Sequence, residues 1–270
     1  MIASDFAFSQ TFFGHIYLSI QQEVKEKGIN LLIESINPKA ANDLSLPLFI
    51  ENKSVQGIII LSHITTDYIN MIISTGIPTI LIDHHHPHIQ ADAILTNNHF
   101  GAYLAVEHLI NNNHKNIGFI GNTSFSPSYY ERLQGYYMAL ERHQLPIQKK
   151  FILKDAPDDE KIVEELINNL DELPTAWFCL NDQLGYMVST LLKKRGYLIP
   201  DDTSIFSFDN GQLAQISSPR ITSMEIDLPK YGEKGVQQLL WRINHPNAPT
   251  QEIRFLPNLI EGKSIKWNKD

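Results

Sequence analysis

Polar side chains stand at the ends of several apolar segments of this sequence. The apolar run at 177–180 stops at Asn181 and Asp182, and two similar runs stop at Asp83 and Asp209. A carboxylate accepts hydrogen bonds from two adjacent hydroxyl groups, and an amide both donates and accepts them. The same residue types also cap helices and turns. We predict that Asn181 contacts a ligand and that Asp182 caps the helix that follows it.

Arg132, in the segment ERLQG at 131–135, adds a cationic group to these acids. Its planar guanidinium can hold two neighbouring hydroxyl groups, a carboxylate or a phosphate. The alternative is a surface ion pair with Glu131 or Asp155.

Four histidines, at 84–86 and 88, invite a metal-binding interpretation. Consecutive side chains point in alternate directions, however, and no Cys, Asp or Glu completes a recognisable zinc spacing. We therefore expect no metal here, and instead a polar loop in which His84 contacts the ligand.

The motifs of common enzyme classes are absent from the sequence. It contains no G-x-x-x-x-G-K-[ST] phosphate loop, no G-x-G-x-x-G and no G-x-S-x-G. The acidic pairs at 158–159 and 201–202 fall in turn-like segments and are interpreted as solvated charges. The only cysteine, Cys179, lies in an apolar run typical of a core. We expect no enzymatic activity, no catalytic residue and no cofactor.

These side chains must be positioned by alternating strands and helices. Near-continuous apolar runs are typical of parallel strands covered on both faces, and they occur at 30–35, 57–61, 78–83, 116–121, 175–180 and 204–208. Between them, segments such as 99–112 and 182–195 repeat apolar residues at helical spacing. Repeated β-α units predict parallel sheets. The number of strands favours an α/β fold with two lobes.

Composition indicates an ordinary globular protein and argues against two kinds of partner. Of 270 residues, 22 are Lys or Arg and 30 are Asp or Glu, which gives a formal charge of −8. Binding to nucleic acid depends on neutralising phosphates, so the chain by itself is a poor DNA-binding protein. No apolar run approaches the roughly 20 residues that span a bilayer, and no export signal is visible. We expect no membrane contact and a cytoplasmic location.

Four segments resemble proteins of the lactose/galactose-repressor family. The most specific is PTAWFCLNDQLGYMVSTLLKKRGYLIPDDTSIFSFDN at 174–210, with a strand ending in Asn-Asp, a helix, a Gly-x-x-x-Pro-x-Asp turn and a strand ending in Phe-Asp. The segments 97–122 and 129–140 are similar to two further blocks of the family, and 11–33 resembles the first β-α-β unit that it shares with periplasmic sugar-binding proteins. All four occur in the family's order.

This resemblance implies two doubly wound Rossmann-like lobes joined by three crossovers, as in type I periplasmic binding proteins, with the effector bound between the lobes. The N-terminal lobe would comprise 1–121 and 227–256, and the C-terminal lobe 122–226 and 257–270. Members of the family carry a helix-turn-helix headpiece before this module. We expect that headpiece to be absent from this chain.

The resemblance also implies roles for individual residues. Phe12 and Phe13 follow the first strand, where related sugar binders stack aromatic rings on a sugar, and we expect one to contact ligand and the other to lie in the core. Arg132 matches the family's effector arginine, and Asp209 matches its acid at the rim of the C-terminal lobe. The family often places an acid where Asp83 stands.

One position departs from the pattern. Many relatives carry Gln near the second crossover, where this sequence has Ile226. An apolar side chain cannot supply that hydrogen bond, and the neighbouring Asp227 is a candidate to compensate for it.

Together these features predict the effector-binding module of a transcriptional regulator. It would bind a sugar or sugar phosphate, form a homodimer, and reach operator DNA only through the missing headpiece. The alternative is a transport-type sugar-binding protein, periplasmic or lipid-anchored, which shares the fold but is exported and usually monomeric.

Overall fold

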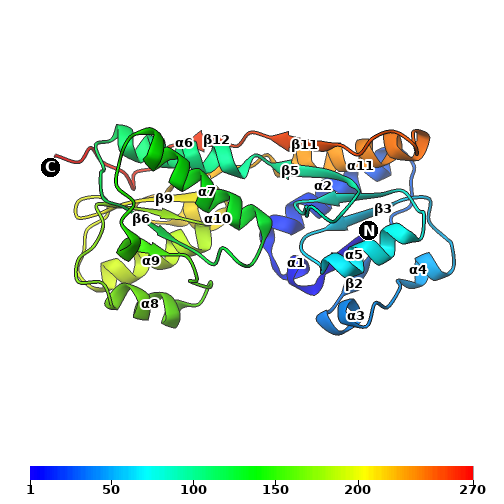
Figure 1. The fold of residues 1–270 in the computed structure, drawn as a ribbon, viewed down its shortest axis with the longest axis horizontal. Coiled ribbons are helices and arrows are strands. Elements are labelled where there is room, and N and C mark those ends of the chain that lie inside the picture. Colours follow the sequence, from blue (N-terminus) through cyan, green and yellow to red (C-terminus); the bar gives the residue numbers. More distant parts are fainter. Residues whose placement is uncertain (270) are drawn as a thin grey trace. The chain divides into compact units, whose positions relative to one another are not determined.

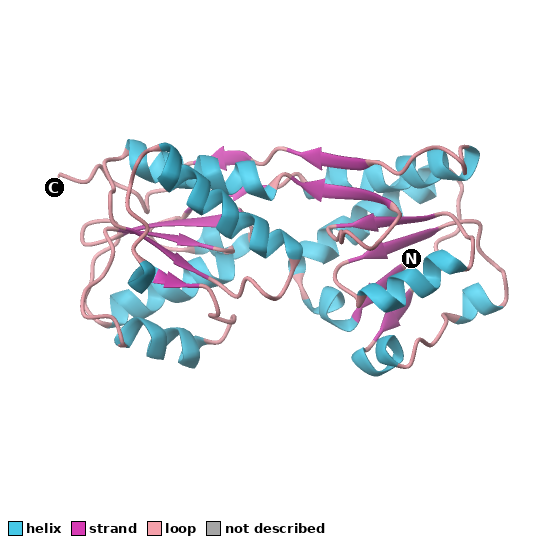
Figure 2. Ribbon diagram, in the orientation of Figure 1, coloured by secondary structure: helices cyan, strands magenta, loops and turns pink. Residues whose placement is uncertain are grey.

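The computed structural model describes residues 1–269, with the side chains of all of them except Phe8 and Ser9. The chain forms two compact units, each built from two separate chain segments. The first unit comprises Met1–Thr96 and Asp227–Phe255, and the second comprises Asn97–Ile226 and the residues from Leu256 onward. Each unit contains one six-stranded sheet, and helices cover both faces of each sheet (Figure 2).

The sheet of the first unit is fully parallel and has the strand order β11-β5-β4-β3-β1-β2 (Figure 1). Its strands are β1 (Ile2–Ser4), β2 (Glu34–Ile36), β3 (Ile58–Leu61), β4 (Thr79–Ile82), β5 (Asp92–Thr96) and β11 (Glu252–Phe255). Its helices are α1 (Asp5–Ser9), α2 (Thr11–Glu26), α3 (Pro38–Asn42), α4 (Leu48–Glu51), α5 (Thr66–Ser74) and α11 (Leu228–Asn244).

The second unit has the strand order β12-β10-β9-β8-β6-β7, in which only the β10–β12 pair is antiparallel. Its strands are β6 (Ile117–Ile120), β7 (Ile152–Leu153), β8 (Ala176–Cys179), β9 (Ser204–Asp209), β10 (Thr222–Glu225) and β12 (Asn258–Ile260). Its helices are α6 (Asn98–Asn111), α7 (Pro127–Arg142), α8 (Glu160–Asn168), α9 (Asp182–Lys194) and α10 (Gln212–Ile216), with a 3₁₀ turn at Lys149–Phe151.

The predicted α/β fold with two doubly wound units is confirmed. Strands β3, β4, β6, β8 and β9 lie within a residue of the predicted runs, because each is apolar and almost wholly buried. The run 30–35 is displaced: the strand begins only at Glu34, and the apolar residues Leu32 and Ile33 before it are exposed. The first strand ends at Ser4, and Phe6 belongs to α1.

The first boundary between the units differs from the expected one. The resemblance places it near 121–122, whereas the chain divides between Thr96 and Asn97. The reason is that α6 packs within the second unit: a Cβ added at Gly101 would lie 2.8 Å from the Phe208 ring. The other two boundaries lie at 226–227 and 255–256, against 226–227 and 256–257 expected.

No helix within residues 1–269 combines the length and the apolar character needed to cross a membrane.

Candidate functional site

Arg132 is the centre of a polar cluster in the second unit. It lies on α7 with 3% of its surface exposed. Its Nη2 donates to Oδ1 of Asp209 at 3.1 Å, its Nε to Oδ1 of Asn98 at 2.9 Å, and its Nη1 to the carbonyl oxygen of Leu180 at 2.7 Å. The guanidinium also lies over the Phe208 ring, 3.8 Å from the ring centroid. These contacts fix the orientation of the guanidinium and make Asp209 its ion-pair partner.

Asn181 joins a helix cap to two further polar groups. Its backbone is extended, at φ −147° and ψ 174°, and its Oδ1 accepts from the N–H of Leu184 at 2.9 Å. Its Nδ2 donates to the hydroxyl of Tyr129 at 3.1 Å and to Oδ2 of Asp158 at 3.2 Å. The prediction that Asp182 caps α9 is therefore wrong. The cap position requires non-helical backbone, which Asn181 has, whereas Asp182 is the first residue of the helix.

Asp182 is instead a buried acceptor. Its carboxylate accepts hydrogen bonds from the hydroxyls of Ser207 and Ser223 and from the backbone N–H of Gly211. Burial raises the pKa of Asp182, and the negative charge of Asp209 raises it further. The three bonds tie β9, β10 and the loop before α10 to the start of α9.

Asp209 and Asn210 have backbone conformations that few residues adopt, with φ at 104° and 49°. Such strain persists only where the surroundings hold it, and it is frequent at ligand sites. Arg132 holds the carboxylate of Asp209, and the N–H of Asn210 donates to Oγ of Ser223 at 3.0 Å. One fifth of the Asp209 side chain remains exposed. Burial raises the pKa of Asp209, and the Arg132 guanidinium opposes that rise.

A second polar cluster lies in the first unit, at the carboxyl end of β4. Asp83 has φ 57°, and its N–H donates to the carbonyl oxygen of Ile94 at 2.9 Å. The Nδ1 atoms of His63 and His84 are 3.0 Å apart, within hydrogen-bond distance. Nε2 of His84 is buried and has no hydrogen-bond partner among the described residues. Burial, together with the charges of the neighbouring histidines, lowers the pKa of His84 to about 4.

Phe12 and Phe13 lie side by side at the start of α2, with their rings edge to face and 5.0 Å between centroids. Phe13 is in the core, with 6% of its surface exposed, whereas Phe12 is half-buried. Phe12 is therefore the ring of this pair that a ligand can reach.

The structure thus sorts the predicted site residues into groups. In the second unit, Arg132 is hydrogen-bonded to Asp209, and Asn181 is hydrogen-bonded to Tyr129 and Asp158. The Arg132 guanidinium lies 5.5 Å from the centroid of the Tyr129 ring and so joins the two sets, and these five residues are called here the Arg132 cluster. Asp83 and His84 are adjacent at one strand end in the first unit. Phe12 lies on α2 of that unit.

Sequence reasoning missed two members of the Arg132 cluster, Tyr129 and Asp158. Asp158 stands beside Asp159, which caps α8, so the pair resembles an ordinary helix start. The interpretation as a solvated charge holds in part, since Asp158 is exposed. Its bond to Asn181 depends on how the β7–α8 loop folds, which no local sequence signal reports.

Asp227, the candidate to compensate for Ile226, caps a helix. It is the N-cap of α11, accepts from the N–H of Lys230 at 3.2 Å and pairs with the Lys230 ammonium at 2.9 Å. Ile226 itself is buried, with 6% of its surface exposed.

Among the described residues, no group of three or more His, Cys, Asp or Glu side chains is arranged to hold a metal ion.

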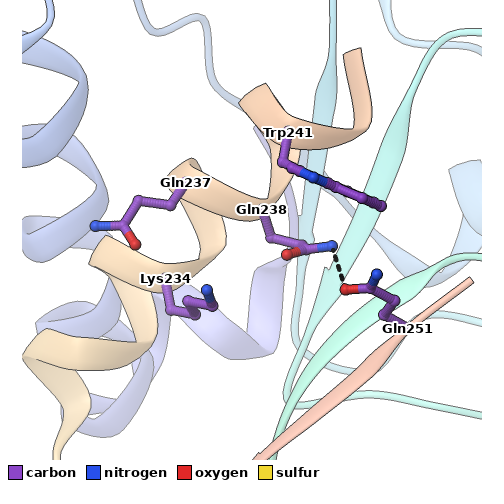
Figure 3. A pocket seen from close by; sticks show the side chains of 5 residues that line it. All are labelled: Lys234, Gln237, Gln238, Trp241 and Gln251. Carbon is purple, nitrogen blue, oxygen red and sulfur yellow. Dashed lines mark hydrogen bonds between the residues drawn. The ribbon is translucent and has the colours of Figure 1, made fainter. Parts of the chain in front are cut away.

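A pocket of about 410 Å³ opens on the first unit, and none of the seven predicted residues is among those that line it (Figure 3). Its lining residues are Lys234, Gln237, Gln238, Trp241 and Gln251. Nε2 of Gln238 donates to Oδ2 of the buried Asp92 at 2.8 Å and to Oε1 of Gln251 at 3.3 Å. Arg242 binds the same Asp92 carboxylate. Gln238, which lines the pocket, therefore also contributes to the hydrogen bonds that join α11 to β5.

The chain is similar to proteins of known sequence and of known structure. The family described as periplasmic binding protein-like domain matches residues 106–265. The HTH-type transcriptional repressor PurR of Actinobacillus pleuropneumoniae serotype 3 (strain JL03) is 29% identical over 263 residues, which cover 94% of this chain and 77% of the relative.

Two solved structures superpose over the whole chain. A LacI family transcriptional regulator from Enterococcus faecium with bound ribose is 25% identical, with a TM-score of 0.83 and 99% of each chain covered. A transcriptional regulator LacI from Bacillus cereus subsp. cytotoxis NVH 391-98 is 22% identical, with a TM-score of 0.87, covering 99% of this chain and 98% of the other.

Proposed function

The chain belongs to the periplasmic binding protein-like family and, within it, to the LacI-type transcriptional regulators, and we propose that it is the module that senses a small effector. The observation that carries this proposal is the Arg132 cluster. Arg132, Asn181 and Asp209 come from far-apart segments of the family-matched region and meet at the carboxyl ends of β8 and β9. In open α/β sheets that edge is where ligands bind.

The effector proposed is a polar metabolite of the sugar class. A carboxylate, an amide and a phenol in one cluster offer acceptors and donors for hydroxyl groups, and the Enterococcus faecium relative binds ribose. We also assign ligand contacts to Phe12, Asp83 and His84 in the first unit, where Asp83 has the same kind of backbone strain as Asp209. Phe13 supports Phe12 from the core.

The proposal includes partners and location. The module pairs as a homodimer, acts in the cytoplasm and controls operator binding without catalysing a reaction. The curated relative is a repressor rather than a transport protein, which favours regulation over the transport alternative. Light scattering after size-exclusion chromatography at micromolar concentration would give twice the 30.8 kDa mass of the chain.

The experiment is a thermal-shift screen of sugars and sugar derivatives against the wild type, Arg132→Ala and Asp209→Asn. A ligand that binds only the native state at 100 times its Kd adds about 2.7 kcal/mol to the free energy of unfolding. Both variants should lose that stabilisation while keeping a folded far-UV circular dichroism spectrum. Lys194→Ala, which removes an exposed ion pair with Glu160, should keep it. Equal stabilisation of the wild type and both site variants would refute the assignment.

A further inference from the structure

The charges in the Arg132 cluster do not balance. The one cation, Arg132, is paired with Asp209 at 3.1 Å. Asp158 adds a second carboxylate, hydrogen-bonded to the neutral amide of Asn181 rather than to a cation. The carboxylate of Asp182, the residue after Asn181, accepts hydrogen bonds from the Ser223 hydroxyl and from the backbone N–H of Gly211. The groups that face a ligand here are therefore negative in sum.

Arg132 is also poorly placed to receive an anion. An anionic group binds a guanidinium best through two parallel N–H donors. Here Nε, Nη1 and Nη2 each already donate to a protein oxygen, and one face of the guanidinium is covered by Phe208. The second N–H groups of Nη1 and Nη2 remain, but a phosphate that reached them would lie beside the carboxylates of Asp158 and Asp209.

The open hydrogen-bonding capacity consists mostly of acceptors. Oδ2 of Asp209 has no hydrogen bond among the described residues, and part of the Asp209 side chain is exposed to solvent. Both carboxylate oxygens of Asp158 face only Nδ2 of Asn181, at 3.5 and 3.2 Å, which leaves further lone pairs open. Asp158 is exposed, so a ligand can reach its carboxylate.

We infer that the effector presents O–H or N–H donors to Asp158 and Asp209 and carries no phosphate or carboxylate group. The ligand class is thereby narrowed from a sugar or sugar phosphate to an uncharged or amine-bearing hydroxylated molecule, such as a free sugar or an amino sugar. This inference rests on the proposed function of the same cluster.

The test compares matched pairs of probes by calorimetric titration and thermal shift: ribose with ribose 5-phosphate, glucose with glucose 6-phosphate, and glucosamine with glucosamine 6-phosphate. For the pair that binds, the unphosphorylated member should bind the wild type at least tenfold more tightly. Asp158→Asn keeps the size of the side chain but removes its charge. It should weaken the unphosphorylated member several-fold and narrow the difference between the two members.

The control is Asp171→Asn, which removes an exposed carboxylate outside the cluster and should leave every affinity unchanged. Equal or tighter binding of the phosphorylated member would overturn the inference, as would an unchanged affinity in Asp158→Asn. If the phosphorylated member binds and Arg132→Ala abolishes that binding, the proposed function stands and only the inference fails. Binding by none of the six probes would count against both.

Discussion

Asn181 uses the two ends of one amide for different tasks. The oxygen caps α9 through the N–H of Leu184, and the nitrogen orients Tyr129 and Asp158. The cap stabilises the fold, and the orientation prepares the ligand site. Because the two tasks fall on different atoms, substitution can separate them.

Asn181→Ser should keep the cap and lose the orientation. Serine caps helices about as well as asparagine, whereas alanine at a cap costs about 1 kcal/mol. In urea unfolding, the serine variant should retain wild-type stability and the alanine variant should lose about 1 kcal/mol. Both should bind effector more weakly, as measured by calorimetric titration. A serine variant as unstable as the alanine variant would contradict the assignment of the cap.

His84 should make stability depend on pH. Its folded pKa, about 4, lies below the ordinary value of 6.5. A lowered folded pKa gives stability that is present above pH 6.5 and is lost as the pH falls toward 4. At pH 5 the loss amounts to about 2 kcal/mol, since each pKa unit is worth about 1.4 kcal/mol.

The measurement is urea unfolding of the wild type and His84→Gln at pH 7 and pH 5. The difference in the free energy of unfolding between the two proteins reports the titration of His84 and its effect on the neighbouring His63. Between pH 7 and pH 5, the free energy of unfolding of the wild type should fall by about 2 kcal/mol more than that of His84→Gln. A difference that does not change with pH would show that His84 is freely hydrated in the folded protein.

At the scale of elements, close contact between α6 and α7 depends on one glycine. A Cβ at Gly135 would collide with the carbonyl oxygen of His99 and lie 2.7 Å from Cβ of Ala102. Gly14, also inside a helix, has nothing within 4 Å of the same added atom. The two positions are matched in backbone and differ only in their neighbours.

Alanine substitutions at these glycines should have opposite effects. Gly135→Ala should lower the free energy of unfolding by about 1–3 kcal/mol through overpacking. Gly14→Ala should raise it by about 0.5–1 kcal/mol, because alanine has the better helix propensity. Urea unfolding gives both values, and a loss of stability in both variants would show that α2 is more tightly packed than described.

Some strands could be predicted from the sequence more easily than others because of the residues they contain. Strands such as β8, AWFC, are apolar on both faces and stand out from their surroundings. Two of the missed strands carry polar residues: β11, EIRF, is an edge strand with two exposed residues, and in β10, TSME, Ser223 and Glu225 make hydrogen bonds to Asn210. Strand β5, DAILT, was also missed, although all five of its residues are buried. Arg132, Asn181 and Asp209 were accessible from motif and resemblance. Asp158 was not, because its role depends on a loop that brings distant segments together.

At the scale of the whole molecule, the first unit depends on a buried ion pair between its two chain segments. Nη2 of Arg242, on α11, donates to Oδ1 of Asp92, on β5, at 2.6 Å, and its Nε donates to Oδ2 at 3.0 Å. The Asp92 side chain is fully buried. Arg242 also donates to the carbonyl oxygens of Ala248 and Pro249, which fixes the chain on its way to β11.

Arg242→Ala should therefore destabilise the protein strongly. Removing one partner of a buried pair leaves an uncompensated charge and costs about 3–5 kcal/mol. Lys194→Ala is the matched control: its ion pair with Glu160 is exposed, so its loss should change the free energy of unfolding little. Urea unfolding of both variants checks the contrast, and similar losses would mean that Asp92 is reached by solvent.

The interleaving of the two units also determines when each can mature during protein synthesis. Domains made of one continuous stretch fold in turn as the ribosome releases them. Here the first unit receives α11 and β11 only after residue 227, and the second closes its sheet with Asn258–Ile260. In the nascent chain, the apolar face of β4, where Ile80 and Ile82 later pack against Gly235, therefore remains without its covering helix until α11 has been synthesised. Both units are then completed almost together, because β11 and β12 are separated by only a few residues of the chain.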